Sequence, residues 1–418
     1  MLAVLKKTEL YTNSIKRPKL FRTATGPTEM PHSTRKIALI YDARLTYDLK
    51  VMAGVAAYLQ EGHHYSVFIE ENALKDQRLP DLRSWEGDGI IADFDDPAVA
   101  RLVAQARLPA VGFGGGYGWY GSGSVPYFYT NNKAISKLAA DHLLDRGFKH
   151  FAYCGYAQSP INGWSRERQD AFVTYLSKRE RSCAVLEKFQ RPNHNWASLQ
   201  RTLGEWLRKL PKPVGIMAAN DTRGRQVLEA CRTYGLVVPD EVAVVGVDND
   251  ELLCRLSSPP LSSVEQGARK LGYAAAALLD NMMQGRSIKK RHNLVDPVSV
   301  VTRQSTDVLA IDDPKVAQAM AFIRDHAADG IKVPDVVSSV AISRSGLEAR
   351  FTSALDCSIH AAIRHRKLEC ARRLVSETDM PLKQIASETG FASVQHMTTL
   401  FVQEFGQAPG KQRRSYTV

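Results

Sequence analysis

Short apolar runs alternate with longer amphipathic stretches between residues 36 and 306, and this alternation constrains the fold more than any other feature of the sequence. Each apolar run ends in turn or polar residues, as expected of a buried strand, and the stretches between the runs have helical spacing. Strands that alternate with helices favour parallel sheets covered on both faces. The predicted strands are 37–41, 65–69, 89–94, 110–113, 151–154, 185–189, 214–218, 242–247 and 298–301. The predicted helices include 47–60, 132–145, 165–177, 196–210, 223–234 and 266–283.

This α/β region is longer than one doubly wound unit needs, so we expect a core of two lobes. In such sheets, ligands bind outside the carboxyl ends of the strands. Polar residues follow several of the predicted strands here, at Asp42, 93–96, Asn220–Asp221 and 248–250. The sequence therefore predicts a polar ligand site at the strand ends.

After Asp312 the strands stop and the chain becomes all-helical. Asp313 followed by Pro314 is typical of a linker that enters a helix, because proline is favoured at the first helical position. We place the domain boundary near 308–313. The predicted organisation is a basic disordered tail at 1–35, an α/β core at 36–308 and an all-α domain at 314–418.

Two segments of the all-α domain, 336–351 and 382–397, share one internal design. In the first, Ser343 caps a helix whose Leu347 and Phe351 face inward. In the second, Gly390 supplies a tight turn and Ser393 supplies the cap. Both segments fit helix-turn-helix units whose second helix enters the major groove of DNA. A long helix at 359–376 is predicted to join them.

Four motifs in this domain resemble those of AraC-type transcription regulators. They are ISRSGLEARF at 342–351, RKLECARRL at 366–374, GFAS at 390–393 and FGQAP at 405–409. The chain departs from the family pattern at Asp356-Cys357, where a glycine is usual, and at Met397, where a phenylalanine is usual. We expect both departures to alter packing only.

The AraC-type resemblance implies that two recognition helices read adjacent major-groove segments of double-stranded promoter DNA. Base contacts would come from exposed residues of those helices: Arg344, Ser345, Glu348, Arg350, Val394, Gln395, His396 and Thr399. Arginine, glutamine and glutamate match the edges of guanine, adenine and cytosine. Arg350 has an alternative role as the partner of a helix acid. Lys367, on the joining helix, is expected to contact phosphate or solvent.

The α/β core resembles the effector core of LacI-type regulators and the periplasmic binding proteins that carry sugars. The motifs GIMAAND at 215–221, VVGVDN at 244–249 and LSSVEQ at 261–266 carry this resemblance. We expect no amino-terminal DNA-binding headpiece of the LacI type, because residues 1–35 do not fit one. A core of this type joined to an AraC-type domain is similar, over nearly the whole chain, to a family of bacterial regulators that respond to D-xylose.

This combined resemblance implies D-xylose or a similar sugar as the effector. Carboxylates and a guanidinium suit vicinal hydroxyls, because each bridges two of them with charge-assisted hydrogen bonds. By motif, the ligand-binding residues would be Arg168, Asp248, Asn220, Asp221, Asn131, Gln266 and Asp95, with Trp164 as an apolar wall. Three alternatives stay open. Asp248 would cap the next helix, Arg168 would be a helix-surface charge, or Trp164 would only pack.

Together these features predict a sugar-gated activator that works as a homodimer with RNA polymerase, without catalytic residues, cofactor or metal. The alternative is an activator or repressor that responds to another pentose or hexose. A transport carrier is disfavoured because it has no use for 314–418, and an enzyme because no nucleophile–base pairing emerges. The glycine-rich stretch 112–123 lacks phosphate-loop spacing and is expected to be a loop near the ligand.

The net charge of +11 adds little to the DNA-binding prediction. Residues 1–36 hold eight Lys or Arg against two Glu, whereas 310–418 hold fourteen Lys or Arg against twelve Asp or Glu. More than half of the excess therefore lies in the tail, where either Met1 or Met30 is a possible start. The six cysteines lack metal-ligand spacing and are expected to be small core residues. Without a signal-peptide core or an apolar span, the protein is expected to be cytoplasmic, with no membrane partner.

Overall fold

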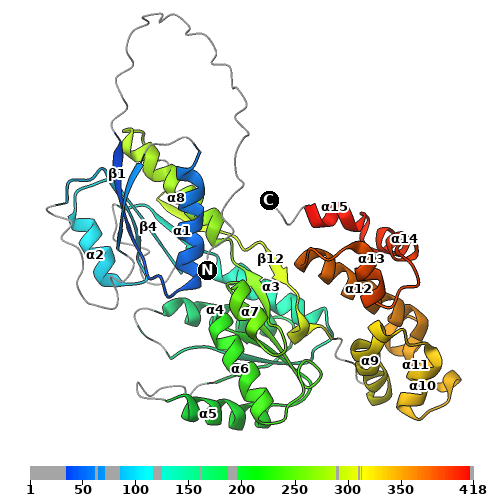
Figure 1. Cartoon of the computed structure of the whole chain (residues 1–418). Coiled ribbons are helices and arrows are strands. Elements are labelled where there is room, and N and C mark those ends of the chain that lie inside the picture. The colour runs from blue at the N-terminus through cyan, green and yellow to red at the C-terminus, as the bar shows by residue number, and fades with distance from the viewer. Residues whose placement is uncertain are drawn as a thin grey trace, which may run out of the picture.

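The computed structural model describes residues 34–61, 65–70, 85–115, 125–157, 159, 162–186, 195–288, 291–308, 311 and 313–414. Two α/β lobes are followed by a helical unit that lies beside the second lobe (Figure 1). The predicted fold class, a two-lobed α/β core followed by an all-α domain, is confirmed. Residues 1–33, which include nearly all of the tail and Met30, and residues 116–123 of the glycine-rich stretch lie outside the described residues.

The first lobe is a parallel sheet of six strands in the order β11-β5-β4-β3-β1-β2. The strands are β1 (Arg35–Ile40), β2 (Tyr65–Glu70), β3 (Gly89–Asp93), β4 (Ala110–Gly114), β5 (Tyr127–Thr130) and β11 (His292–Val295). Side chains alternate between its faces. Ile37 and Leu39 pack with α1 (Thr46–Leu59) and α8 (Ala268–Met283), whereas Ala38 and Ile40 pack with α2 (Pro97–Gln105).

A glycine on each of helices α1 and α8 allows the two backbones to pack in close contact. A Cβ atom on Gly54 would lie 1.9 Å from the carbonyl oxygen of Arg269, and one on Gly272 would lie 1.8 Å from that of Val51. No other residue fits either position without separating the two helices.

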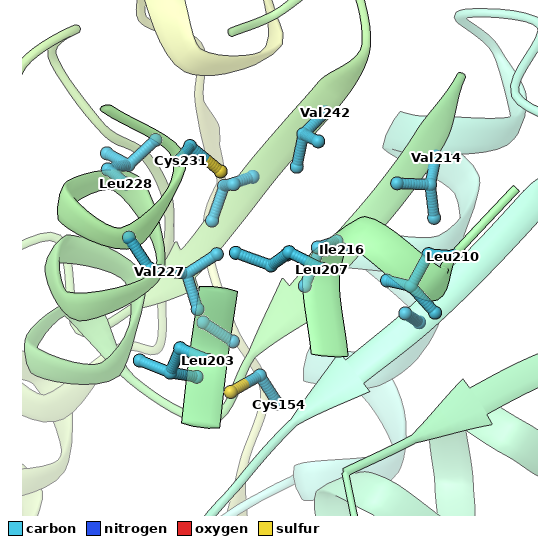
Figure 2. Packing of buried hydrophobic residues seen from close by; sticks show 14 of the residues in the cluster. Cys154, Leu203, Leu207, Leu210, Val214, Ile216, Val227, Leu228, Cys231 and Val242 are labelled. Atoms are coloured by element: carbon cyan, nitrogen blue, oxygen red, sulfur yellow. The ribbon is translucent and has the colours of Figure 1, made fainter. Parts of the chain in front are cut away.

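The second lobe has six strands in the order β12-β10-β9-β8-β6-β7, parallel except for β12, which is antiparallel to β10. The strands are β6 (His150–Cys154), β7 (Cys183–Val185), β8 (Val214–Ala218), β9 (Val242–Val247), β10 (Ser262–Glu265) and β12 (Ser299–Val301). Figure 2 shows Leu203 and Leu207 of α5 (Trp196–Lys209) and Val227 of α6 (Asp221–Thr233) packed against one face. Helices α3 (Asn132–Leu144) and α4 (Gly163–Ser177) cover the other.

The chain passes from one sheet to the other between β5 and β6, between β10 and β11, and between β11 and β12. Asn131 and Asn132 lie on the first passage, and Gln266 lies on the second. These residues are therefore held where the two lobes meet.

Most predicted strands of the core are present, with bounds shifted by one or two residues. The predicted strand 185–189 is wrong in its bounds: β7 ends at Val185, and 187–189 lie outside the described residues. The sequence did not predict β5, β10 and β11 as strands. Strand β10 was missed because Ser262 and Ser263 look polar, although both are fully buried and hydrogen-bonded.

The helical unit starts where Asp313 caps α9 by accepting from the N–H groups of Lys315 and Val316, with Pro314 at the first helical position. Its helices are α9 (Pro314–His326), α10 (Val333–Val340), α11 (Arg344–Leu355), α12 (Ile359–Glu377), α13 (Leu382–Glu388), α14 (Val394–Phe405) and α15 (Pro409–Arg414). Helix α12 contributes Ile363 to a core with α9, α10 and α11, and Leu368 to a second core with α13 and α14. One continuous helix therefore fixes both helix-turn-helix units relative to each other.

All six cysteines are free; Cys154, Cys231 and Cys254 are buried, and the other three are half-buried. No group of three or more His, Cys, Asp or Glu side chains in the described part of the chain is arranged to hold a metal ion. None of the described helices combines the length and the apolar character that crossing a bilayer requires.

Candidate ligand site and nucleic-acid interface

Arg168, on α4, is the centre of a buried polar network where the lobes meet. Its side chain donates from Nε to Asn132 Oδ1 at 2.9 Å, from Nη1 to the carbonyl oxygen of Ala219 at 2.7 Å, and from Nη2 to Gln266 Oε1 at 2.8 Å. The residue is only 3% exposed, so the alternative of a helix-surface charge is wrong. A buried guanidinium is stable only with such partners.

Asp248 extends this network from the end of β9. Gln266 donates from Nε2 to Asp248 Oδ1, so Arg168, Gln266 and Asp248 form one hydrogen-bonded chain. The following helix, α7 (Glu251–Leu256), is capped by Asp250, which accepts from the N–H of Leu253 at 2.9 Å. The alternative of Asp248 as a helix cap is therefore wrong.

The turn that carries Asp248 has an unusual backbone. Asp248 has φ of 109° and Asn249 has φ of 49°, a left-handed pair without glycine. Such conformations persist only where the surroundings impose them, and they cluster at ligand sites.

The first lobe contributes a group of carboxylates on the same side. Asp95 accepts at both oxygens from the N–H of Gly115, at 2.9 and 3.0 Å. Burial raises the pKa of Asp95 to about 7, although the Gly115 N–H and the Arg168 charge counteract the rise. Burial likewise raises the pKa of the neighbouring Asp48 and Asp93 well above the usual range.

Asp248 behaves as Asp95 does. Burial raises its pKa to about 7, and the positive charges of Arg168 and Lys50 counteract the rise. Arg168 therefore lies within electrostatic reach of one carboxylate from each lobe.

An aromatic corner lies beside Arg168. The guanidinium lies 4.8 Å from the centroid of the Trp164 ring, and the Tyr156 ring meets Trp164 edge-on with centroids 5.9 Å apart. The Tyr156 hydroxyl donates to Asn220 Oδ1 at 2.9 Å, and the same oxygen caps α6 by accepting from the N–H of Arg223. The sequence did not single out Tyr156, although an aromatic residue just after β6 was a usable signal.

Two of the predicted ligand residues have other partners. Asp221 accepts from Ser263 Oγ at 2.5 Å through Oδ1 and from the N–H of Asp250 at 2.7 Å through Oδ2, inside the second lobe. Asn131 caps α3 and donates to Asp296 Oδ1 at 2.8 Å. The structure therefore brings together Arg168, Asp248 and Gln266, with Asp95, Asn220 and Trp164 around them.

Asn132, which the sequence did not single out, joins the network instead of its neighbour Asn131. It donates from Nδ2 to Glu167 Oε2 at 2.7 Å and to the carbonyl oxygen of Gly115 at 2.6 Å, besides accepting from Arg168. Only the direction of α3 decides which of the two adjacent asparagines turns inward. No local sequence signal specifies that direction.

Lys50, on α1 of the first lobe, reaches across to the second. Its Nζ donates to the carbonyl oxygens of Asp248 at 2.6 Å and Asn249 at 3.0 Å, and it pairs with Glu265 Oε2 at 2.5 Å. Thr46 also donates across, to Asp250. The two lobes are thus in direct contact at the turn that carries Asp248.

These groups supply both hydrogen-bond donors and acceptors around a buried guanidinium, a combination that suits the hydroxyl groups of a neutral polyol.

Both predicted helix-turn-helix units are present, with the predicted serine caps. Ser343 accepts from the N–H of Gly346 at 3.2 Å and Ser393 from that of His396 at 3.1 Å, so each caps its recognition helix. Leu347 and Phe351 are fully buried, as predicted.

The turn of the second unit requires glycine. Gly390 has φ of +68°, and a Cβ atom there would lie 2.8 Å from the carbonyl oxygen of Ala328. Lys367 donates to the Gly390 carbonyl oxygen at 2.9 Å, so this lysine braces the turn. The sequence instead predicts that this lysine contacts phosphate or solvent.

The predicted base-reading residues differ in how available they are. Of the eight predicted residues, two are half-buried, Glu348 and Val394. The other six are exposed: Arg344, Ser345, Arg350, Gln395, His396 and Thr399. Arg350 pairs with Asp313 Oδ2 at 2.7 Å, which is the alternative role that the sequence left open. Glu348 accepts from the N–H of Ile359 at 3.4 Å.

The backbone conformation explains why aspartate can stand at position 356, where AraC-type regulators usually have glycine. Helices α11 and α14 both end in a left-handed residue, which is Asp356 with φ of 51° in the first unit and Gly406 with φ of 72° in the second. Glycine is favoured there because it has no Cβ, but aspartate is among the residues that tolerate the conformation best. Met397 is fully buried, in agreement with a packing role.

Three family models match successive parts of the chain. The model of a XylR N-terminal domain matches residues 36–133, that of a periplasmic binding protein-like domain matches 140–306, and that of a helix-turn-helix domain matches 336–415.

The chain is 38% identical over 380 residues to the xylose operon regulatory protein of Escherichia coli K12, covering 90% of this chain and 96% of that protein. It is 37% identical over 378 residues to the protein of the same name from Haemophilus influenzae, covering 90% and 97%. The solved structure of a xylose-binding transcription activator, xylR, matches with a TM-score of 0.73 and 36% identity, over 93% of this chain and all of that one.

Proposed function

This chain belongs to the family of xylose operon regulatory proteins, and we propose that it binds D-xylose where its lobes meet and in response activates transcription from promoter DNA. The single observation that carries this proposal is the network in which Arg168 joins Gln266 and, through it, Asp248. This network provides directional donors and acceptors at a site flanked by both lobes. The same chain ends in a helix-turn-helix pair that is built for DNA.

In this proposal, six residues contact the sugar: Arg168, Asp248, Gln266, Asn220, Asp95 and Trp164. The carboxylates accept from vicinal hydroxyls, Arg168 donates to hydroxyl oxygens, and Trp164 covers an apolar face of the ring. Asn131 and Asp221 do not contact the sugar in this proposal. The Asn131 side chain is hydrogen-bonded to Asp296, and that of Asp221 is hydrogen-bonded to Ser263.

For DNA, we assign base reading to the exposed residues of α11 and α14, foremost Arg344, Ser345, Gln395, His396 and Thr399. Arg344 suits guanine and Gln395 suits adenine in the major groove. We further infer that the protein acts in the cytoplasm as a homodimer whose two helical units engage promoter half-sites, and that it recruits RNA polymerase. The exposed Leu252 and Leu256 on α7 support a subunit interface.

The sugar assignment is tested by calorimetry on the purified full chain with D-xylose, L-arabinose, D-ribose and D-glucose. We expect D-xylose to bind most tightly, because the spacing of buried polar groups rejects sugars that leave one of them unpaired. Tight binding of another sugar without binding of D-xylose would leave the fold intact and overturn the effector assignment.

The raised pKa values of Asp95 and Asp248 predict that the affinity for sugar depends on pH. At about pH 6 the carboxyl groups of Asp95 and Asp248, with pKa about 7, are mostly protonated in the folded, sugar-free protein. A sugar whose hydroxyls donate to these carboxylates favours the ionised forms, so binding must release the protons. Sugar affinity should therefore rise between about pH 6 and about pH 8, by up to about tenfold per pH unit for each proton released.

Calorimetry in buffers with different ionisation enthalpies measures this proton release directly. An affinity that stays constant over the range, with no proton release, would show that the hydroxyls do not donate to these carboxylates.

A further inference from the structure

Arg303 connects the turn at the ligand site to another part of the second lobe. It follows β12, is 7% exposed, and donates from Nη2 to Asn249 Oδ1 at 2.8 Å. The same guanidinium donates to the carbonyl oxygen of Leu261 and to Glu251 Oε2, both at 3.0 Å. Because Asn249 stands beside Asp248 in the left-handed pair and is also held by Lys50 of the first lobe, Arg303 is anchored on a turn that both lobes shape.

The backbone after Arg303 is fixed to the second lobe by buried hydrogen bonds. Ser305 donates to the carbonyl oxygen of Val244 at 2.6 Å and accepts from the N–H of Ser262 at 2.8 Å. Thr306 Oγ1 lies 2.7 Å from His142 Nε2, and its carbonyl oxygen accepts from Arg146 Nε at 2.7 Å. Ser305 and Thr306 are fully buried, so this segment is a rigid connection and not a loose linker.

Asp307 ends this segment and forms an ion pair with Arg366 of α12. The Arg366 side chain is only 14% exposed, and that of Asp307 is 33% exposed. Both residues line a groove of about 1560 Å³ between the second lobe and the helical unit, which lie side by side in Figure 1. Since α12 contributes to both helix-turn-helix cores, a displacement at Arg366 moves both units.

We propose that residues 303–307 couple the ligand site to the DNA-binding unit, and that the ion pair between Asp307 and Arg366 is the junction. This inference rests on the proposed function, because it requires that sugar binding changes DNA affinity. Lys50 already holds the turn of Asp248 and Asn249 from the first lobe, and a sugar that bridges the two lobes stabilises this contact. Arg303 then holds residues 303–307 in the position from which Asp307 orients α12.

A second Asp–Arg pair provides a matched control. Arg324 of α9 donates to both oxygens of Asp240, at 2.5 and 2.7 Å. Asp240 precedes β9, whereas Asp248 follows it, so this pair holds the same helical unit from the opposite end of the strand.

The test compares the wild type with Asp307→Asn, Arg366→Gln, Asp307→Glu and Asp240→Asn in the full chain. The readout is the ratio of the Kd values for a DNA duplex without and with saturating D-xylose, where the duplex is one that the wild type selects from a random library. In the wild type we expect a ratio in the range of about 5–150, which is typical of allosteric coupling. Asp307→Asn and Arg366→Gln should bring it close to one, while Asp307→Glu and Asp240→Asn should keep most of it.

Asp307→Asn and Arg366→Gln should still bind D-xylose in the absence of DNA, with a Kd within about twofold of the wild-type value. Both residues lie outside the hydrogen-bond network of Arg168, Gln266 and Asp248. Coupling is reciprocal, so the duplex should also tighten xylose binding by the same ratio in the wild type and not in Asp307→Asn. If Asp307→Asn kept the wild-type ratio of Kd values, or if Asp240→Asn reduced that ratio to one, the ion pair of Asp307 and Arg366 would not be the junction. The proposed function would be unaffected by either result. A ratio of one in the wild type, or no xylose binding by it, would overturn both.

Discussion

Replacing Asp248 by alanine is expected to weaken D-xylose binding by about 100-fold or more, while both lobes stay folded. The substitution removes a charged acceptor for sugar hydroxyls, and each hydrogen bond to a charged group contributes about 1.5–3 kcal/mol. It also leaves the Gln266 amide, which donates to this carboxylate, without its acceptor. A carboxylate that accepts from two sugar hydroxyls loses about 3–6 kcal/mol in this way, which corresponds to a change in Kd of about 100-fold to 10,000-fold.

Calorimetry with D-xylose measures this effect. Asp248→Asn is the control for the backbone, because asparagine tolerates a positive φ as aspartate does, and it should bind with intermediate affinity. Asp170→Asn, in an exposed pair with Arg166 on α4, should bind like the wild type. An unchanged affinity in Asp248→Ala would remove Asp248 from the sugar site.

Replacing Phe401 by alanine is expected to abolish DNA binding and to leave sugar binding intact. Phe401 of α14 is fully buried in the second core of the helical unit, where it packs with residues of α12 and α13, and such a change costs about 3–5 kcal/mol. That cost is comparable with the whole stability of a small unit, so the second helix-turn-helix should unfold. The two lobes have separate hydrophobic cores and should not be affected.

The neighbouring substitution Val402→Ala is the matched control, because Val402 is 41% exposed on the same helix. It should change stability by about 0.5 kcal/mol or less and keep DNA binding. Fluorescence anisotropy with the selected duplex and calorimetry with D-xylose separate the two activities. Loss of sugar binding in Phe401→Ala would contradict the independence of the cores.

The helix-turn-helix units were the most predictable part of this chain. Their caps and turn depend on local chemistry: Ser343 and Ser393 accept from N–H groups three residues later, and Gly390 adopts a positive φ. The strands with continuous apolar runs were also predictable, because the signal again lies within a short stretch of the sequence. Strand β10 was not, because its buried serines are satisfied by distant partners such as Arg303 and Asp221.

The ligand site was predictable in its place but not in its detail. Strand-end position indicates which edge a residue lies on, but it does not show which way the side chain turns. Asp221 therefore looked equivalent to Asp248, although its oxygens are occupied by Ser263 and Asp250. Lys50 and Asn132 were missed because their partners lie across the two lobes, and pairings at such sequence separations leave no local pattern.

The central claim is that a sugar held where the lobes meet changes how the helical unit binds DNA. Titrating the selected duplex with the full chain, with and without saturating D-xylose, and following fluorescence anisotropy tests it most directly. We expect D-xylose to tighten binding in the wild type and to have no effect in Asp248→Ala. Equal DNA affinities with and without D-xylose in the wild type would contradict the claim.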